Sequence, residues 1–350
     1  MRVVVVGATG NVGTSVLEAL VDEPRVESVL GLARRRPRLE LPKVEWAEAN
    51  VDSDDLVPHF RDADCVVHLA WKIQPSRDAA AVWQTNVHGS SRVFLAAGDA
   101  GVPALVYASS VGAYSPGPKD RRVDESWPTG GIRTSFYSRH KAEVERILDH
   151  FERDWPETRV VRLRPGLIFK REAATGIRRL FAGPFLPSPL LHPRLLPLVP
   201  DIPRLRFQAV HSRDVGHAYR LAIVRNVRGA FNIAAEPLLD PAELARILGA
   251  RRVRVPAAIA RAATTLTWRL HLQPTPPGWL DVALGVPLLD TTRARTELGW
   301  EPRARADDAL LELLEGVRVG AGAPTPPLDP ATSGPARMRE LAGGLGSREA

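Results

Sequence analysis

Cysteine is almost absent from this chain, and so are long hydrophobic runs. Cys65 is the single cysteine among 350 residues, so no disulfide can form within the chain. It opens the apolar run 65–70, which favours a buried thiol on a strand. No stretch approaches 18 uninterrupted apolar residues, which argues against a transmembrane helix. The first strand begins at residue 2 or 3, before any signal peptide could fit, so we expect a cytoplasmic protein with no membrane partner.

Acidic residues are fewer than basic ones, 40 against 47, which gives a formal net charge of +7. Such a surplus can indicate nucleic-acid binding. The basic residues are scattered, however, and most of the surplus is arginine in an Ala/Arg/Pro-rich sequence, so a compositional bias explains it better. Only residues 34–36, together with Arg38, form a tight basic cluster. We therefore expect no nucleic-acid partner.

The most informative stretch is at the N-terminus, where four valines lead into Gly7-Ala-Thr-Gly10-Asn-Val-Gly13. The valines predict a strand buried on both faces, and an amphipathic helix follows the glycines. Gly7 can make the tight turn, Gly10 lets the backbone approach a pyrophosphate, and Gly13 allows close helix packing. The helix N-terminus then offers free N–H groups to an anion. The pattern predicts a dinucleotide site; the alternative is a glycine-rich turn without a ligand.

Strand and helix patterns alternate through the first half of the chain. The expected strands are 2–6, 28–33, 44–46, 65–70, 104–109 and 159–164. The expected helices are 12–22, 53–60, 80–100 and 136–153. This order predicts an α/β fold, a Rossmann-type doubly wound parallel sheet with its ligand at the carboxyl edge.

The second half of the chain has a different texture. Many prolines in 183–205 exclude a continuous helix and predict an irregular apolar loop, either beside a pocket or packed on the core. The remaining expected elements are strands at 207–211 and 229–234, helices at 240–249 and 291–298, and a packed helix at 256–270. We expect a cofactor-binding core at 1–165 with returning segments near 205–235. A smaller substrate-binding lobe at 166–318 and a disordered tail at 319–350 complete the expected organisation.

Tyr137 and Lys141 are four residues apart on a predicted helix, which places both side chains on one face. Lowering the pKa of a tyrosine from near 10 by about three units needs roughly 4 kcal/mol. An ammonium about 4 Å away at an effective dielectric of 20 supplies about that much. The pair can therefore work as an acid–base group, although this spacing also occurs by chance on surface helices.

Two further features are predicted near strand ends or helix faces. Ser109 and Ser110 end a strand, where a hydroxyl can bind a substrate oxygen; the alternative is a serine pair that caps a turn. Asn86 is unfavourable inside a helix, so a hydrogen-bonding role is expected, with a helix start as the competing account.

These residues together carry a family resemblance. The motifs occur in order and at familiar spacing: Gly7-x-x-Gly10-x-x-Gly13, His68-Leu-Ala70, Asn86-Val-x-Gly89, Ser109-Ser110, Tyr137-x-x-x-Lys141 and Arg164-Pro-Gly166. Later segments agree: Val210-His-Ser-Arg-Asp214, Phe231-Asn-Ile-Ala and Leu298-Gly-Trp300. Over residues 1–315 the chain resembles the extended short-chain dehydrogenase/reductases, also called NAD-dependent epimerase/dehydratases. The resemblance implies an NAD(P)-dependent enzyme that transfers hydride between a nicotinamide and a carbonyl or alcohol carbon.

The resemblance also implies a role for each matching residue. Tyr137 would be the general acid/base, Lys141 its pKa partner and ribose ligand, and Ser110 the group that orients the substrate oxygen. Asn86 would help to place Lys141 or a relay water. The implied cofactor residues are Gly7, Thr9, Gly10, Asn11, Val12, Gly13, Arg34, Arg35, Asn50, Val51, Leu69, Ala70, Tyr137, Lys141, Pro165 and Gly166. No metal is implied, and a homodimer through helices 80–100 and 136–153 is expected.

The cofactor and substrate are predicted from positions at which this chain departs from the usual residues of the family. The strand 28–33 ends in Ala33 rather than an acid and is followed by arginines, which favours NADP(H) over NAD(H). Val111-Gly112 after the serines argues against a sugar 4,6-dehydratase, and the stretch 287–290 lacks the arginine of a nucleotide-sugar epimerase. We favour reduction of an apolar carbonyl compound. The alternatives are a nucleotide-sugar epimerase, with Arg204, Arg206 or Arg213 as substitutes, and a non-catalytic NADP-sensing protein.

Overall fold

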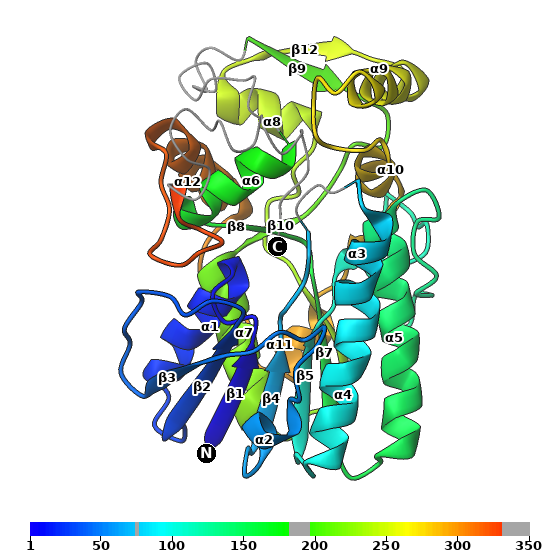
Figure 1. Cartoon of the computed structure of the whole chain (residues 1–350). Coiled ribbons are helices and arrows are strands. Elements are labelled where there is room, and N and C mark those ends of the chain that lie inside the picture. Colours follow the sequence, from blue (N-terminus) through cyan, green and yellow to red (C-terminus); the bar gives the residue numbers. More distant parts are fainter. Residues whose placement is uncertain (74–76, 182–196, 331–350) are drawn as a thin grey trace.

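Seven parallel strands form the central sheet of the protein in a computed structural model that describes residues 1–73, 77–181 and 197–330 (Figure 1). The strand order is β11-β7-β5-β4-β1-β2-β3, so the chain runs outward from β1 in both directions. This confirms the predicted Rossmann-type doubly wound sheet. The strands are β1 (Arg2–Val6), β2 (Ser28–Ala33), β3 (Val44–Glu48), β4 (Cys65–His68), β5 (Ala104–Ala108), β7 (Arg159–Pro165) and β11 (Gly229–Ile233).

Helices cover both faces of this sheet. Val3 and Val5 of β1 belong to the core beneath α1 (Asn11–Val21) and α7 (Ser212–Val224). Val4 and Val6 belong to the opposite core, beneath α2 (Val57–Phe60), α4 (Gly89–Asp99) and α5 (Phe136–Asp154). β1 is therefore buried on both faces, as its run of valines predicts.

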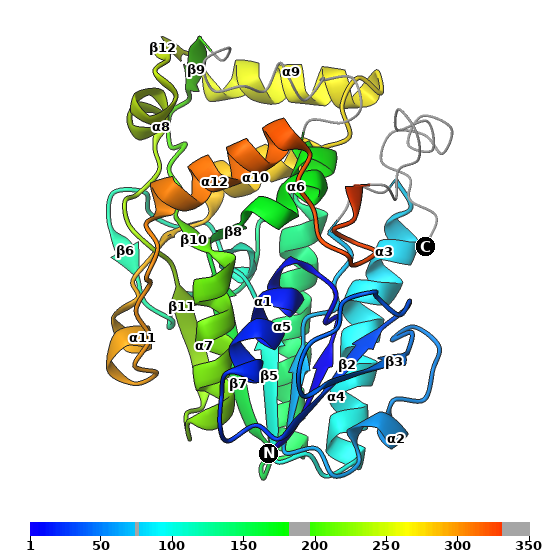
Figure 2. The same cartoon turned by 90° about the vertical axis from the view of Figure 1, so that its left-hand side faces the viewer.

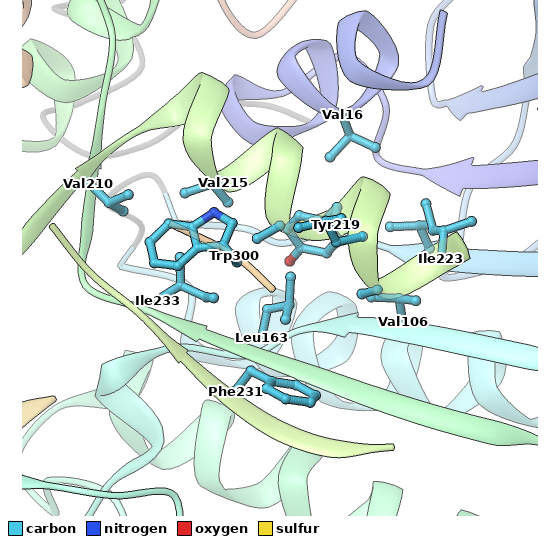
Figure 3. Packing of buried hydrophobic residues seen from close by; sticks show 14 of the residues in the cluster. Val16, Val106, Leu163, Val210, Val215, Tyr219, Ile223, Phe231, Ile233 and Trp300 are labelled. Atoms are coloured by element: carbon cyan, nitrogen blue, oxygen red, sulfur yellow. The ribbon is translucent and has the colours of Figure 1, made fainter. Parts of the chain in front are cut away.

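The core on the α7 side is closed by a residue from the far end of the chain. Figure 3 shows the indole of Trp300 among Val210, Val215 and Ile233. Its Nε1 donates a hydrogen bond of 2.8 Å to the Asp214 carbonyl oxygen, so this buried polar atom is satisfied. The contact joins the Leu298-Gly-Trp300 segment to α7.

The remaining elements build a smaller lobe above the carboxyl edge of the sheet (Figures 1 and 2). Its short strands pair as β8 (Leu167–Phe169) with β10 (Ala209–His211), β9 (Leu198–Asp201) with β12 (Arg251–Arg254), and β6 (Arg122–Val123) with β13 (Leu288–Leu289). Its helices are α6 (Ala174–Phe181), α8 (Pro241–Leu248), α9 (Ala257–Arg269), α10 (Gly278–Gly285) and α12 (Ala306–Val319). The short helix α11 (Thr292–Thr296) lies instead beside β11 of the central sheet, where Arg293 donates to the Ala230 carbonyl oxygen (Figure 2).

Several predictions for single elements need correction. The helix expected at 80–100 is α3 (Ala79–Trp83), a π-helical turn η1 (Gln84–His88) and α4 in succession. The helix expected at 53–60 is reduced to α2, because the turn at 50–54 holds its own hydrogen bonds. The helix expected to be packed at 256–270 forms as α9, yet none of its residues is buried.

Two predictions concern segments that are only partly described. Residues 183–196 of the expected apolar loop lie outside the described residues, and β9 follows them as one strand of a two-stranded sheet. Residues 321–330 belong to the expected disordered tail, but they make backbone and side-chain hydrogen bonds, so the prediction is wrong for them. Residues 331–350 lie outside the described range.

Candidate active site

The glycine-rich loop joins β1 to α1 at the carboxyl edge of the sheet. Gly7 has a φ of 85°, and a Cβ there would lie 2.6 Å from the Ala70 nitrogen, so only glycine fits. A Cβ on Gly13 would lie 2.5 Å from the Ala8 carbonyl oxygen. A Cβ on Gly10 would meet only the Gly7 carbonyl oxygen, at 3.6 Å, so this side of the loop leaves room for a ligand.

The start of α1 has the properties of an anion site. Gly10 is its N-cap residue and no side chain caps the first turn, so the first N–H groups lack partners within the helix. Asn11 donates from Nδ2 to the Ile168 carbonyl oxygen at 3.3 Å, while its Oδ1 is buried without a hydrogen-bond partner. Free donors and an orphaned acceptor at one helix start fit a dinucleotide, which carries phosphates and hydroxyls.

The other predicted cofactor residues follow neighbouring strands. They are Arg34 and Arg35 after β2, Asn50 and Val51 after β3, Leu69 and Ala70 after β4, and Pro165 and Gly166 at the end of β7. Because these strands are parallel, all eight residues lie at the edge that carries the glycine loop. Arg34 and Arg35 are exposed, and neither guanidinium has a partner in the described part of the chain. Their roles remain predictions.

A segment from the C-terminus also reaches the glycine loop. The Thr325 hydroxyl donates to the carbonyl oxygen of Thr9 at 2.9 Å, and the Arg38 nitrogen donates to the carbonyl oxygen of Pro324 at 3.2 Å. Thr325 is buried in this contact. Residues 324–325 therefore bridge the loop after β1 and the arginine-rich loop after β2. The sequence gives no signal for this contact, since its proline-rich surroundings resemble a linker.

Tyr137 lies in the first turn of α5, which Ser135 caps by accepting a hydrogen bond from the Ser138 nitrogen. The Ser110 hydroxyl, just after β5, lies beside the Tyr137 ring: both come within 3.4 Å of the position that a Cβ on Gly112 would take. Its ring stacks on Trp279 of α10 with centroids 4.8 Å apart and meets Trp71 edge-on at 6.1 Å. The structure thus brings two predicted catalytic residues together between two tryptophans that sequence reasoning missed.

Lys141 is one helical turn beyond Tyr137 and is buried. Its Nζ donates to the Ala108 carbonyl oxygen at 2.6 Å and to the Tyr107 hydroxyl at 3.5 Å. The ammonium also lies 3.5 Å from the centroid of the Trp71 ring, a cation–π contact. Trp71 therefore contacts both members of the Tyr137–Lys141 pair.

The pKa of Tyr137 moves in the opposite direction from the sequence expectation. Burial raises the pKa of Tyr137 to about 12, and the hydrogen bond from Ser110 only partly opposes this. Burial also holds the pKa of Lys141 well below its usual range, against the attraction of the Glu145 carboxylate. The physical reason is desolvation: an apolar aromatic site penalises both the phenolate and the ammonium.

Asn86 lies in the π-helical turn η1 and is completely buried. Its Oδ1 accepts from the Lys72 nitrogen at 2.7 Å, and its Nδ2 donates to the Lys72 carbonyl oxygen at 3.0 Å. Both hydrogen bonds of the amide hold the segment after β4, next to Trp71. The expected contact with Lys141 is therefore not made directly.

A network of buried ion pairs lies next to Lys141, one turn further along α5. Glu145 of α5 accepts from the Ser109 hydroxyl, from Arg164 Nε and Nη2 at 2.9 Å each, and from Arg162 Nη1 at 3.0 Å. Arg164 also donates to the Tyr114 hydroxyl at 3.1 Å. These donors overcome burial and lower the pKa of Glu145 to about 2. Its spacing, four residues beyond Lys141, is the sequence signal that could have identified it.

Comparison with known proteins places this chain in a family. Residues 3–181 match the NAD dependent epimerase/dehydratase family. The chain belongs to this family. An uncharacterized protein of Mycobacterium tuberculosis is 25% identical over 327 residues, covering 92% of this chain and 31% of that protein, so the chain spans about a third of this relative's length. The L-arabinose 1-dehydrogenase (NAD(P)(+)) of Haloferax volcanii is 36% identical over 111 residues, 31% of this chain and 41% of that enzyme.

Solved structures agree on the fold. The UDP-glucose 4-epimerase of Thermotoga maritima, solved with UDP-glucose, has a TM-score of 0.68 at 20% identity, covering 91% of this chain and 99% of that one. Because this chain belongs to the NAD dependent epimerase/dehydratase family, NAD(P) is its expected cofactor. Within the described ranges, no helix has the length and apolar character needed to cross a bilayer. The described residues also contain no group of three His, Cys, Asp or Glu that could hold a metal ion.

Proposed function

We propose that the protein is an NADP(H)-preferring oxidoreductase that interconverts an apolar carbonyl compound and its alcohol. The observation that carries the proposal is that the Ser110 hydroxyl lies beside the Tyr137 ring at the sheet edge that also holds the glycine loop. Two hydroxyl groups held together there can share one substrate oxygen, and the open side of Gly10 leaves room for a dinucleotide next to them.

The roles of the side chains follow from this geometry. In the reducing direction, Tyr137 donates its phenolic proton to the substrate oxygen while Ser110 holds that oxygen by a hydrogen bond. The nicotinamide, when bound, supplies the hydride to the carbonyl carbon. In its protonated form, Lys141, one turn away, would stabilise the phenolate that remains. In the oxidising direction Tyr137 takes the alcohol proton instead.

The preference for NADP(H) rests on the end of β2. Ala33 brings no carboxylate to repel a 2′-phosphate, and Arg34 and Arg35, whose guanidinium groups have no partner among the described residues, follow it directly. We expect Arg34→Ala/Arg35→Ala to raise the Kd for NADPH roughly 10- to 100-fold, the value of one charge-assisted hydrogen bond. The Kd for NADH should stay unchanged. Arg295→Ala, which removes an exposed arginine on α11, is the matched control.

The walls of the site favour an apolar substrate. Trp71 and Trp279 pack against Tyr137 from two sides. Two arginines that could take the place of the missing diphosphate-binding arginine are engaged elsewhere. Arg204 donates to the carbonyl oxygens of Gly117 and Leu284. Arg206 donates to the carbonyl oxygen of Lys119.

The experiment is NADPH oxidation across a panel of apolar ketones and aldehydes, with Tyr137→Phe and Ser110→Ala as variants. We expect turnover that falls by about 10²- to 10⁴-fold in Tyr137→Phe while NADPH binding persists. The structural relatives keep a nucleotide-sugar epimerase as the second candidate, and UDP-glucose binding without turnover of the panel would favour it. Cofactor binding with no turnover of either substrate class would point to an NADP-sensing protein. The homodimer through α4 and α5 stays a prediction.

A further inference from the structure

Helix α9 presents its apolar side to solvent. Ile259, Leu266 and Leu270, the last at its C-cap, are 61%, 58% and 58% exposed. Residues seven and four apart lie on one helical face, so these three form one stripe. Ala262 and Ala263 fill the gap between them and are exposed as well. An amphipathic helix of a soluble protein ordinarily turns such a stripe to the core.

The opposite side of α9 is less apolar. Thr264, Thr265 and Thr267 are only partly exposed, and each hydroxyl donates back to a carbonyl oxygen of the helix itself. Trp268 supplies the aromatic contact on this side, under the guanidinium of Arg77. Packing among the described residues therefore leaves the apolar stripe uncovered.

Unpaired arginines surround the stripe. Arg251 and Arg254 of β12 and Arg269 of α9 are exposed, and none of the three has a side-chain partner among the described residues. Val253 of β12 and Leu198 of β9 add apolar surface that is 44% and 57% exposed. Two other arginines are neutralised, since Arg252 pairs with Asp201 at 3.7 Å and Arg261 with Asp281 at 2.9 Å. The surface keeps a net positive charge.

The position of this surface suits docking. Figures 1 and 2 both place α9, β9 and β12 at the outer end of the lobe, opposite the N-terminus. α10 lies directly below α9 and carries Trp279, which stacks on Tyr137. A partner bound here would therefore contact the lobe that meets the catalytic residue and would leave the glycine loop free.

We propose, against the sequence expectation of no membrane partner, that the surface formed by α9, β9 and β12 docks on an anionic lipid bilayer. Leucine and isoleucine on an exposed helix can enter the interface between headgroups and acyl chains, while arginines at its edge bind anionic headgroups. A second copy of this chain would bring the same arginines against themselves, which costs electrostatic energy. A nucleic acid would complement the arginines but not the apolar stripe. The lipid surface complements both.

Vesicle co-sedimentation of the full chain tests the proposal. We expect binding to vesicles of phosphatidylcholine and phosphatidylglycerol in equal parts, and little binding to phosphatidylcholine alone. Removing the charge with Arg251→Gln, Arg254→Gln and Arg269→Gln should weaken partitioning about fivefold for each arginine. Leu266→Gln/Leu270→Gln should reduce binding to background. Leu311→Gln, which alters an exposed leucine on α12, should bind like the unaltered protein.

Each alternative occupant gives a different result. Failure of the unaltered protein to bind the anionic vesicles overturns the proposal, and so does equal binding by Leu266→Gln/Leu270→Gln. A dimer that dissociates in this variant, without vesicle binding, would assign the surface to a second copy. Retention on DNA without vesicle binding would assign it to nucleic acid. NADPH binding by each variant, followed by fluorescence, verifies the fold and does not depend on which substrate the enzyme uses.

Discussion

Replacing Gly112 by alanine should displace Tyr137, the proposed general acid/base, without removing any functional group. Gly112 lies in the turn η2 (Val111–Ala113) that follows β5, and its nitrogen donates to the Ser110 hydroxyl oxygen at 3.0 Å. A Cβ there would lie 2.6 Å from Cε1 and 3.1 Å from Cδ1 of Tyr137. The turn is also fixed from the other side, because the Ser138 hydroxyl donates to the Gly112 carbonyl oxygen.

The size of the effect follows from these distances. Two carbons pack at about 3.5–4.0 Å, so the ring or the turn must move by roughly 1 Å. The ring has little freedom, since Trp279 stacks on it with centroids 4.8 Å apart and Trp71 meets its edge. A misplacement of about 1 Å can cost roughly 100-fold in rate. The same crowding should lower the free energy of unfolding by about 1–3 kcal/mol.

The assay is kcat/KM for NADPH-dependent reduction of the best substrate of the carbonyl panel, with NADPH affinity measured in parallel. Gly285→Ala is the matched control, because its Cβ would meet only the mobile end of the Ile132 side chain, at 2.9 Å. We expect kcat/KM to fall by about 100-fold in Gly112→Ala and to change little in the control. Full activity of a correctly folded Gly112→Ala would refute the placement of Tyr137 at the reacting centre.

Three further predictions concern charge and the glycine loop. In the oxidising direction, kcat/KM should rise with pH through the neutral range, because Tyr137 must lose its proton and burial raises its pKa to about 12; a flat profile would contradict this. Glu145→Gln should lower the free energy of unfolding by about 3–5 kcal/mol in urea titrations, since Arg164 would lose a buried partner. In the unaltered protein that carboxylate has a lowered pKa of about 2, so its contribution is present above its ordinary pKa of 4.5 and is lost as the pH falls toward 2. Thr325→Val should weaken NADPH binding about fivefold, roughly the value of the one hydrogen bond that steadies Thr9; Thr325→Ser should restore it.

The cofactor half of the molecule was predictable because its signals are local. Val3 to Val6 alternate between two cores, and the run of valines by itself indicates a strand buried on both faces. Gly7 and Gly13 are required by close contacts with the neighbouring strand's end and within the strand–loop–helix unit, while Gly10 leaves its side of the loop open. Sequence order along such a unit fixes its geometry, so the sheet and the loop could both be derived from spacing.

The lobe was predicted less well because its contacts are distant in sequence. Trp279 reaches Tyr137 across 142 positions, and α10 follows prolines that resemble the end of a structured segment. The contact of Thr325 with Thr9 spans 316 positions in a proline-rich stretch. For α9 the helix itself was predicted correctly, but its burial was not. Apolar periodicity indicates a helix and cannot say whether its apolar side meets the core or another partner.

For Tyr137 and Lys141, the sequence identifies the motif but predicts the wrong direction for the pKa shift of Tyr137. The sequence argument places a full positive charge on Lys141 and lets it stabilise a phenolate at an effective dielectric of 20. In the folded protein Lys141 is buried against Trp71, and the cost of removing an ammonium from water holds its pKa well below the usual range. The charge on Lys141 then depends on what faces it, namely the Glu145 carboxylate and the ligand in the cofactor site. An oxidised nicotinamide is itself cationic, so it would favour the phenolate directly. The working pKa of Tyr137 therefore belongs to the cofactor complex, and the pH profile of the oxidation should be displaced toward lower pH relative to titration of Tyr137 in the cofactor-free protein.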